Sequence, residues 1–328
     1  MSQEQKPIRV AIGDNLWTRA LVDGSVRVDG FPVEFHSNVT LPDRLHGVRE
    51  GKWQGSDGTL TDYLLEKDAA LGVPKVALPI FMLGGFRQRT LLMRRDDASV
   101  EGLKGRKVLL PRVLTPGAVY VRGLLADEFG IAREAIEWHA IHGAEEDADW
   151  NRLKGRLDKP EGFEAVVAAA ELLSRGKFDA LIHPGGHGFF SLFGGDRMIG
   201  GTLKRFPDLC EPLGHAQDIA AWFRKTKIYP AVHGLQIRTD CLDANPGLAD
   251  ALVGAFSRAW AASEARLDAR ERELIERERS VLGFDPYRYE LGEVQRHTIE
   301  KLMDYLQADG LLRRRFTIEE LFPLAGQR

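Results

Sequence analysis

The chain has 328 residues, and its 45 lysines and arginines nearly balance its 48 aspartates and glutamates, giving a formal net charge of -3. This balance argues against a nucleic-acid partner, which needs clustered basic charge, and no apolar run approaches the ~20 residues of a membrane span. At about 150 residues per domain, the length predicts two domains.

The first ninety residues alternate between short strand and helix patterns. Strand patterns lie at 8–13, 32–36 and 75–82, and helical spacing lies at 16–22, 41–50 and 60–71. Thr59 or Thr61 is expected near the start of the third helix. This alternation predicts a parallel or mixed sheet with helices on its faces.

A second α/β unit begins near residue 95. Its strand patterns lie at 105–110, 136–141 and 178–182, and its helical patterns lie at 116–129 and 165–175. Thr115 as N-cap and Pro116 at the first helical position mark the start of the first of these helices. The polar stretch 142–164 is too long for a compact connection, which favours a lid-like insertion or a mobile loop.

After residue 185 the chain becomes glycine-rich, and it then shows a helical pattern at 215–224 and a strand pattern at 231–238. The remainder is helical, with one long amphipathic helix over 246–279 and a shorter one over 293–308. We expect lobe 1 to comprise residues 1–92 and 232–328, and lobe 2 to comprise residues 93–231.

Short motifs along the chain match one known family. Residues 103–108 lead into the Thr-capped helix in the manner of the second lobe of type 2 periplasmic binding proteins. Narrower matches occur, in order, at Asp14-x-x-x-Thr18-Arg-Ala-Leu21, at Tyr63-Leu64 with Ala77-x-Pro79-x-Phe81 and Phe86-Arg87, at 121–130, at Phe178-Asp-Ala-Leu181, at 225–233 and at Thr317-x-Glu-Glu-Leu-Phe322. Together these motifs resemble the 4,5-dihydroxyphthalate decarboxylase family, over about residues 8–322.

The resemblance implies an α/β, two-lobed type 2 periplasmic-binding-protein-like fold, in which two crossover hinge strands join the lobes and the ligand occupies the cleft. At positions expected to line that cleft, the chain departs from the family pattern. The departures are Leu83-Gly84 and Gln88 in place of a Ser-Arg pair and a His, Pro111-Arg112 in place of Pro-Glu, and His183-Pro-Gly-Gly-His187 in place of Arg and Ser or Thr. The substrate is therefore open among phthalate-like and other aromatic or cyclic acids.

The implied reaction is the cofactor-free loss of CO2 from a hydroxylated aromatic acid. It needs a general acid for the ring carbon, a cation for the carboxylate and a base facing the phenol. Histidine suits the acid, because its ordinary pKa lies near neutral pH. His233 is the first candidate, at the point where the second crossover strand should re-enter lobe 1, and His183 is the second, after a buried strand. A histidine bonded to backbone at a strand end is an equally weighted alternative for His233.

Arg87 is the first candidate for binding the carboxylate, because a planar guanidinium matches a carboxylate in two bonds. The further substrate-binding candidates are Arg19, Arg112, Thr115, Tyr63, His187 and Tyr229. Asp14, Asp57 and Asp62 are candidates for the phenol-facing base, with Asp14 preferred, although each is also explained as a helix cap.

Several alternatives stay open. His183, His187 and His233 could hold a divalent metal, but the sequence fixes no acidic partner for them, so no cofactor is required. A solute-binding protein for a small organic anion, or another lyase on this scaffold such as the menaquinone-pathway synthases, would share the fold. The lack of a leader pattern after Met1 favours a cytoplasmic enzyme. The long C-terminal helices leave a homo-oligomer open.

Overall fold

The computed structural model describes residues 6–39, 41–110, 112–140, 153–156, 163–185, 192–194 and 196–323. The chain forms two compact units, and no helix of the described residues is long and apolar enough to cross a bilayer. Unit 1 comprises Met1–Gly84, Ala231–Glu300 and Arg313–Arg328, and unit 2 comprises Gly85–Pro230 and Lys301–Leu312. Unit 2 therefore starts before the expected residue 93, and it includes a C-terminal segment that the sequence analysis assigned to lobe 1.

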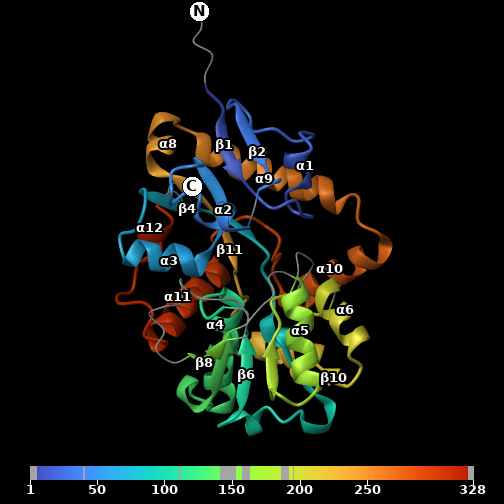
Figure 1. The fold of residues 1–328 in the computed structure, drawn as a ribbon. Coiled ribbons are helices and arrows are strands. Elements are labelled where there is room, and N and C mark those ends of the chain that lie inside the picture. The colour runs from blue at the N-terminus through green and yellow to red at the C-terminus, as the bar shows by residue number, and fades with distance from the viewer. Residues whose placement is uncertain are drawn as a thin grey trace, which may run out of the picture. The chain divides into compact units, whose positions relative to one another are not determined.

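Unit 1 is built on a five-stranded mixed sheet in the order β2–β1–β3–β11–β4 (Figure 1). The strands are β1 (Ile8–Ala11), β2 (Val33–His36), β3 (Gly55–Thr59), β4 (Lys75–Met82) and β11 (His233–Arg238). β1 pairs in parallel with β2 and β3, and β11 runs antiparallel to both β3 and β4. β3 has the sequence Gly-Ser-Asp-Gly-Thr and is buried throughout. The middle strand of the sheet therefore contains no large apolar residue.

The helices with residues in unit 1 are α1 (Arg19–Val22), α2 (Leu41–His46), α3 (Leu60–Asp68), α8 (Thr239–Ala244), α9 (Leu248–Glu264), α10 (Ala269–Leu282), α11 (Glu293–Ala308) and α12 (Ile318–Leu321). Thr59 caps α3 as expected, accepting the Asp62 N–H at 3.0 Å. The single long helix predicted over 246–279 is wrong. Asp268 and Glu271 form a capping box that starts α10 separately from α9.

Unit 2 contains a six-stranded mixed sheet in the order β10–β5–β9–β6–β7–β8. Its strands are β5 (Leu91–Arg94), β6 (Lys107–Leu110), β7 (Glu137–Ala140), β8 (Leu153–Arg156), β9 (Ala180–Ile182) and β10 (Leu209–Cys210). β8 falls inside the stretch expected to be a polar insertion, and it pairs in parallel with β7. The rest of that stretch up to residue 162 lies outside the described residues.

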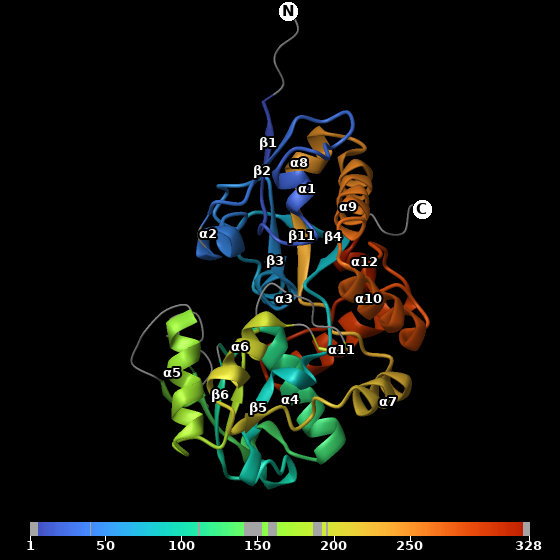
Figure 2. The ribbon, with the colours of Figure 1, turned by 90° about the vertical axis from the view of Figure 1, so that its right-hand side faces the viewer.

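The helices that lie wholly in unit 2 are α4 (Pro116–Phe129), α5 (Phe163–Ser174), α6 (Arg197–Arg205) and α7 (Ala216–Thr226). Val108 and Leu110 of β6 pack in a cluster with residues of α4, whereas Leu109 packs in a second cluster with residues of α5 and α6. Figure 2 shows α4 and α5 on opposite sides of this sheet. The continuous apolar run of β6 therefore reflects burial on both faces.

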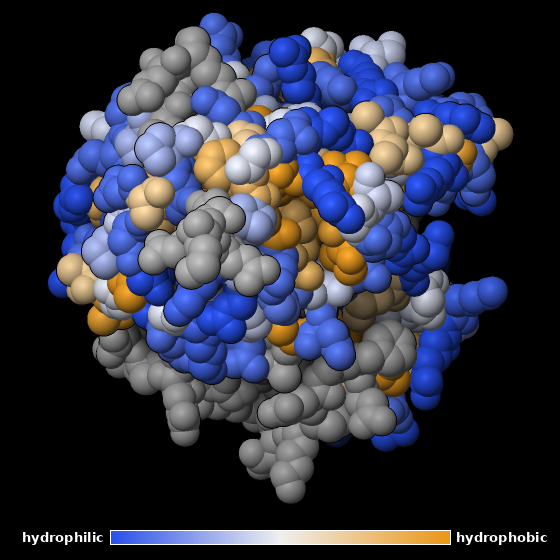
Figure 3. All heavy atoms as spheres, turned by 90° about the horizontal axis from the view of Figure 1, so that it is seen from above, coloured by the Kyte–Doolittle hydropathy of each residue, from blue (hydrophilic) through white to orange (hydrophobic). Residues whose placement is uncertain are grey.

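On the face drawn in Figure 3, hydrophilic side chains surround smaller hydrophobic areas. Among the described residues, Leu71 is a large hydrophobic side chain that stays 53% exposed. It lies between α3 and β4 in unit 1.

A buried ionic cluster attaches the end of α11 to unit 2. The Asp309 carboxylate accepts a hydrogen bond of 2.9 Å from Arg122 Nε on α4 and lies 3.0 Å from Arg133 Nη1. All three side chains are less than a tenth exposed. The Asp309 carboxylate therefore faces two buried cations, of which Arg133 also lies 3.0 Å from Glu134 Oε1.

Replacing this carboxylate should destabilise the protein strongly. We expect Asp309→Ala to lower the free energy of unfolding by about 3–5 kcal/mol, because the substitution removes the carboxylate that the buried guanidinium groups of Arg122 and Arg133 contact. Urea unfolding followed by circular dichroism measures the loss. Asp14→Ala, which removes an exposed ion pair with Arg19, is the control and should cost less than about 1 kcal/mol. Equal losses for the two variants would contradict this account.

Candidate functional site

Two neighbouring strands place Asp57 and His233 on the same face of the unit 1 sheet. The register pairs His233 with Thr59 and Leu235 with Asp57. Because side chains two residues apart on a strand share a face, Asp57 and His233 are diagonal neighbours. His233 Nδ1 lies 3.4 Å from Asp57 Oδ1, and the two side chains are 10% and 1% exposed.

The other oxygen of Asp57 is held by two further elements of unit 1. The Gly13 N–H, just after β1, donates to Oδ2 at 2.9 Å, and Arg44 Nη1 of α2 donates to the same atom at 3.0 Å. Burial alone would raise the pKa of Asp57, but His233, Arg44 and the Gly13 N–H together hold this pKa below its usual value. The carboxylate is therefore ionised at neutral pH although it is fully buried.

The loop after β1 keeps the Gly13 N–H in place. The Thr18 hydroxyl donates to the Gly13 carbonyl, and Asn15 Oδ1 accepts the Trp17 N–H at 3.0 Å. A Cβ on Gly13 would lie 2.2 Å from Arg44 Nη1, so the guanidinium would have to shift if this position carried a side chain. The close approach of the guanidinium thus depends on glycine.

This arrangement defines which nitrogen of His233 can exchange a proton with a ligand. An ionised carboxylate facing Nδ1 favours a proton on that nitrogen of the ring. Nε2 is then the atom that gives or takes a proton. The cluster lies at the carboxyl ends of the parallel strands β1 and β3, where α/β sheets usually bind ligands.

Unit 2 carries a buried arginine beside a helix start. Arg87 opens the 3-10 turn Arg87–Thr90 before β5 and is 4% exposed. A Cβ on Gly117, in the first turn of α4, would lie 3.6 Å from Arg87 Cδ. Burial lowers the pKa of the Arg87 guanidinium to about 10, a shift that Asp196 opposes, so the side chain stays charged at neutral pH.

The start of α4 favours an anion nearby. Thr115 is the N-cap and Pro116 the first helical residue, as predicted, but the Thr115 side chain accepts no capping hydrogen bond. Its hydroxyl instead donates to the Arg112 carbonyl at 3.1 Å. The helix N-terminus keeps its partial positive charge next to the Arg87 stem, which is the kind of environment that attracts a carboxylate.

His183 is buried in unit 2 with both ring nitrogens engaged. The Gly185 N–H donates to Nδ1 at 2.9 Å, so the neutral ring carries its proton on Nε2, which lies 3.1 Å from Thr202 Oγ1. Burial lowers the pKa of His183 to about 4, with only partial opposition from Asp196. This environment favours a neutral, structural imidazole over a general acid.

The remaining candidates have varied surroundings. Asp14 and Arg19 form an exposed ion pair of 3.2 Å, and Tyr63 donates its hydroxyl to the Leu321 carbonyl at 2.7 Å. Tyr229 packs its ring edge against Phe86 at 5.2 Å between ring centroids.

The possible metal site depends on residues that the structure covers only in part. His187 lies outside the described residues. Within the described part of the chain, no group of three histidine, cysteine, aspartate or glutamate side chains could hold an ion.

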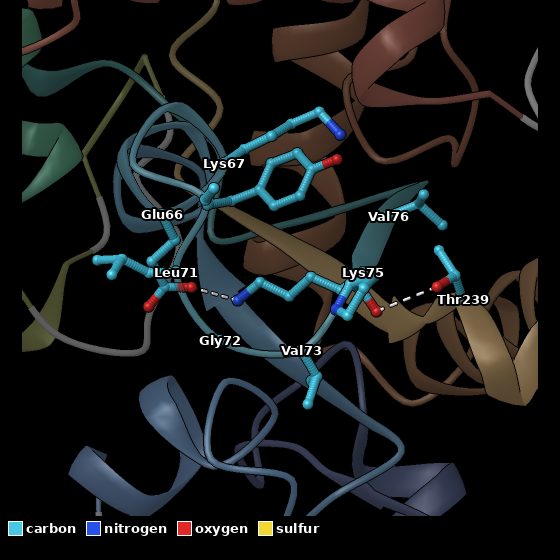
Figure 4. Close-up of a pocket in the computed structure, with 11 residues that line it drawn as sticks. Glu66, Lys67, Leu71, Gly72, Val73, Lys75, Val76 and Thr239 are labelled. Atoms are coloured by element: carbon cyan, nitrogen blue, oxygen red, sulfur yellow. Dashed lines mark hydrogen bonds and ion pairs between the residues drawn. The ribbon is translucent and has the colours of Figure 1, made fainter.

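A separate pocket of about 270 Å³ opens on unit 1, lined by residues of α3, of the segment that follows it and of β4 (Figure 4). Lys75 reaches across it to form an ion pair with Glu66, and Thr239 lies at its far side. In the register of β4 and β11, Lys75 lies opposite Arg238. Arg238 is the last residue of β11, whereas His233 is the first. Of the sequence candidates, only Tyr63 lines this pocket.

Two residues of the Asp57 cluster are absent from the sequence candidates. Arg44 sits in a predicted helix like any helical arginine, and Gly13 reads as a strand end. The available signal was Asp57 itself, a carboxylate set among small residues in Gly55–Thr59, where only a buried partner would balance its charge.

The structural comparisons identify the class of fold. The periplasmic aliphatic sulphonate binding protein SsuA from Escherichia coli aligns with a TM-score of 0.58 and 11% identity, covering 97% of this chain and 92% of that one. The desulfurization enzyme DSZB aligns with a TM-score of 0.52 and 13% identity, covering 96% of each chain. The expected α/β periplasmic-binding-protein-like fold is thereby confirmed, and this fold occurs in both a binding protein and an enzyme.

The sequence comparisons identify closer relatives, although no protein-family model matches. The 4,5-dihydroxyphthalate decarboxylase of Comamonas testosteroni is 27% identical over 332 aligned positions, covering 96% of each chain. The protein of the same name from Pseudomonas putida is 26% identical over 189 positions, covering 54% of this chain and 70% of that protein. The resemblance to the 4,5-dihydroxyphthalate decarboxylases that the motifs indicated is confirmed.

The low pKa of His183 predicts acid sensitivity. Between pH 6.5 and about 4 the unfolded chain binds a proton that the folded His183 does not, so stability should rise with pH across this window and fall on acidification. The contribution is about 3 kcal/mol at most. Urea unfolding at pH 7 and pH 4.5 should therefore show a smaller pH dependence in His183→Gln than in the wild type. An identical pH dependence would contradict a neutral buried ring.

Proposed function

We propose that this protein is a carboxy-lyase that removes CO2 from a hydroxylated, phthalate-type aromatic acid, with His233 as the general acid. One observation carries the proposal: an imidazole at the carboxyl edge of the unit 1 sheet faces a buried, ionised carboxylate. Its support is the similarity to a decarboxylase over 96% of the chain. Such an Asp–His pair serves proton transfer at Nε2.

In this proposal the imidazolium of His233 delivers its Nε2 proton to the ring carbon that bears the carboxylate. The new C–H bond uses a π electron pair of the ring, and a hydroxyl in ortho or para position stabilises the resulting cation. The bond to the carboxylate then breaks, its electron pair restores the aromatic ring, and CO2 leaves. Water returns a proton to His233. Asp57 faces Nδ1 and orients the ring during the transfer.

Asp57 acts in this scheme by orienting the ring of His233 rather than as the phenol-facing base. Each of the three candidate aspartates has a partner. Asp57 binds Arg44 and Gly13, Asp62 Oδ2 accepts the Thr59 hydroxyl at 2.6 Å, and Asp14 pairs with Arg19. A substrate whose phenol is already ionised, or a water acting as base, would fit these contacts.

Arg87 and the start of α4 are proposed to bind a carboxylate of the substrate. The guanidinium is buried but charged, and the helix N-terminus beside its stem adds partial positive charge. Arg112, which follows β6 and is half-buried, is the candidate for a further anionic group. The proposal requires no cofactor.

The proposed acid can be tested by turnover. We expect His233→Gln to lower kcat by about 100-fold or more, because general acid catalysis contributes a factor of this size. The assay measures CO2 release from 4,5-dihydroxyphthalate and from analogues that lack one hydroxyl or one carboxylate. In D2O, the product should carry one deuterium at the carbon that lost CO2. His36→Gln, at a half-buried histidine of β2, is the control. An unchanged kcat in His233→Gln would contradict the assignment of His233 as the general acid.

The proposed carboxylate-binding role of Arg87 predicts a different kinetic change. Arg87→Lys keeps a charge but loses the planar pair of donors, so KM should rise by about tenfold or more while kcat changes less. Arg106→Met, at a half-exposed arginine that pairs with Asp179, serves as the control. A wild-type KM in Arg87→Lys would count against the role.

The likeness to SsuA supports one competing function, that of a solute-binding protein. Calorimetry with the same acids separates the two. Tight binding of a hydroxylated acid with no CO2 released from any of them would favour the binding protein over the carboxy-lyase.

A further inference from the structure

The two oxygens of the Asp57 carboxylate have different neighbours. Oδ2 accepts from Arg44 Nη1 at 3.0 Å and from the Gly13 N–H at 2.9 Å, whereas Oδ1 lies 3.4 Å from His233 Nδ1. Three separate elements of unit 1 therefore converge on one carboxylate. The side chains of Arg44 and Asp57 are 6% and 1% exposed, so both charges are shielded from solvent.

We propose that Arg44 is a positioning residue for the His233 acid. Arg44 and the Gly13 N–H together occupy Oδ2 of Asp57 and keep this carboxylate ionised. Oδ1 of Asp57 then stays directed toward Nδ1 of His233. The proton that His233 exchanges with the substrate is therefore carried on Nε2. The catalytic part of this inference rests on the proposed function, whereas the assignment of the ring proton does not.

The electrostatics of the cluster require a cation at this place. An ionised carboxylate with almost no contact with water is costly unless it is paired and hydrogen-bonded. Without Arg44, the positive charge facing the carboxylate would be that of protonated His233 alone, and this charge is lost when the Nε2 proton goes to the substrate. With Arg44 present, a positive charge remains 3.0 Å from Asp57 Oδ2 after His233 has given up its proton.

The groups that act on Asp57 come from each element packed around it. They are His233 on β11, Arg44 on α2 and the Gly13 N–H after β1. On α3, Asp62 is held by the Thr59 hydroxyl at 2.6 Å, beyond the end of β3. Arg44 is thus the permanent positive charge among the groups that act on this carboxylate.

Gly13 gives the proposal a second, independent variant. A methyl group at this position would lie 2.2 Å from Arg44 Nη1, so Gly13→Ala should displace the guanidinium without removing it. Arg44→Met removes the charge at similar volume, and Arg44→Lys keeps a charge with a different geometry. Arg49→Met is the matched control, because Arg49 lies just after α2 and pairs at 3.3 Å with another buried carboxylate, Glu66.

The first experiment measures the ring proton in the free protein. Nitrogen-15 NMR of the histidine rings, assigned with His233→Gln, should show neutral His233 protonated on Nδ1 in the wild type and in Arg49→Met. Arg44→Met and Gly13→Ala should shift His233 toward the form protonated on Nε2, which is the more common form in water. Wild-type spectra in both variants would overturn the proposal.

The second experiment uses turnover of 4,5-dihydroxyphthalate. Arg44→Met should lower kcat by about 10- to 100-fold, the usual effect of losing a residue that supports a reacting group. The pKa of Asp57 should rise in this variant, moving the acidic limb of the kcat/KM profile to higher pH. Arg44→Lys should recover part of kcat, and Arg49→Met should match the wild type.

The two experiments fail in distinguishable ways. Altered ring protonation without any CO2 release in the wild type would reject the proposed function and keep the structural role of Arg44. CO2 release with an unchanged pH profile and kcat in Arg44→Met would reject the role of Arg44 and keep the function. If Arg44→Met does not fold, Gly13→Ala and Arg44→Lys carry the same comparisons.

Discussion

The unit 1 site depends on a negative charge buried where water cannot reach it. Asp57 is fully buried on β3, and its ionisation requires the donors that surround it. That requirement explains several local features together: a strand made of small residues, a glycine after β1 and an arginine of α2 turned inward. Among the three side chains of this network, that of His233 is the most exposed, at 10%.

His233 of unit 1 and His183 of unit 2 have opposite surroundings. Nδ1 of His233 faces a carboxylate, whereas Nδ1 of His183 accepts a backbone N–H and burial lowers the pKa of the His183 ring to about 4. Both residues follow the same sequence logic, being placed at strand ends in an α/β fold. The groups that contact each ring distinguish His233, the candidate acid, from His183, a structural residue. Sequence spacing does not reveal these groups.

The sequence was informative where periodicity and capping decide the structure. The α/β alternation, the start of α3 at Thr59 and the start of α4 at Thr115 are local features, and their patterns predicted them. β3 was not predicted, because Gly-Ser-Asp-Gly-Thr lacks the apolar and β-branched residues by which strands are recognised. The partners of Asp57 were also missed, since tertiary contacts between residues as distant as Arg44 and His233 leave no local signal.

Neither unit is a single stretch of chain, and this bears on the order in which the protein can be completed during synthesis. Most of unit 2 is continuous from Gly85 to Pro230, whereas unit 1 needs β11 and the C-terminal helices before its sheet is whole. The bulk of unit 2 is therefore synthesised after the first part of unit 1 and before β11 completes the unit 1 sheet. Arg122 is 187 residues from Asp309, so their buried ion pair can form only after the chain has passed through unit 1 a second time.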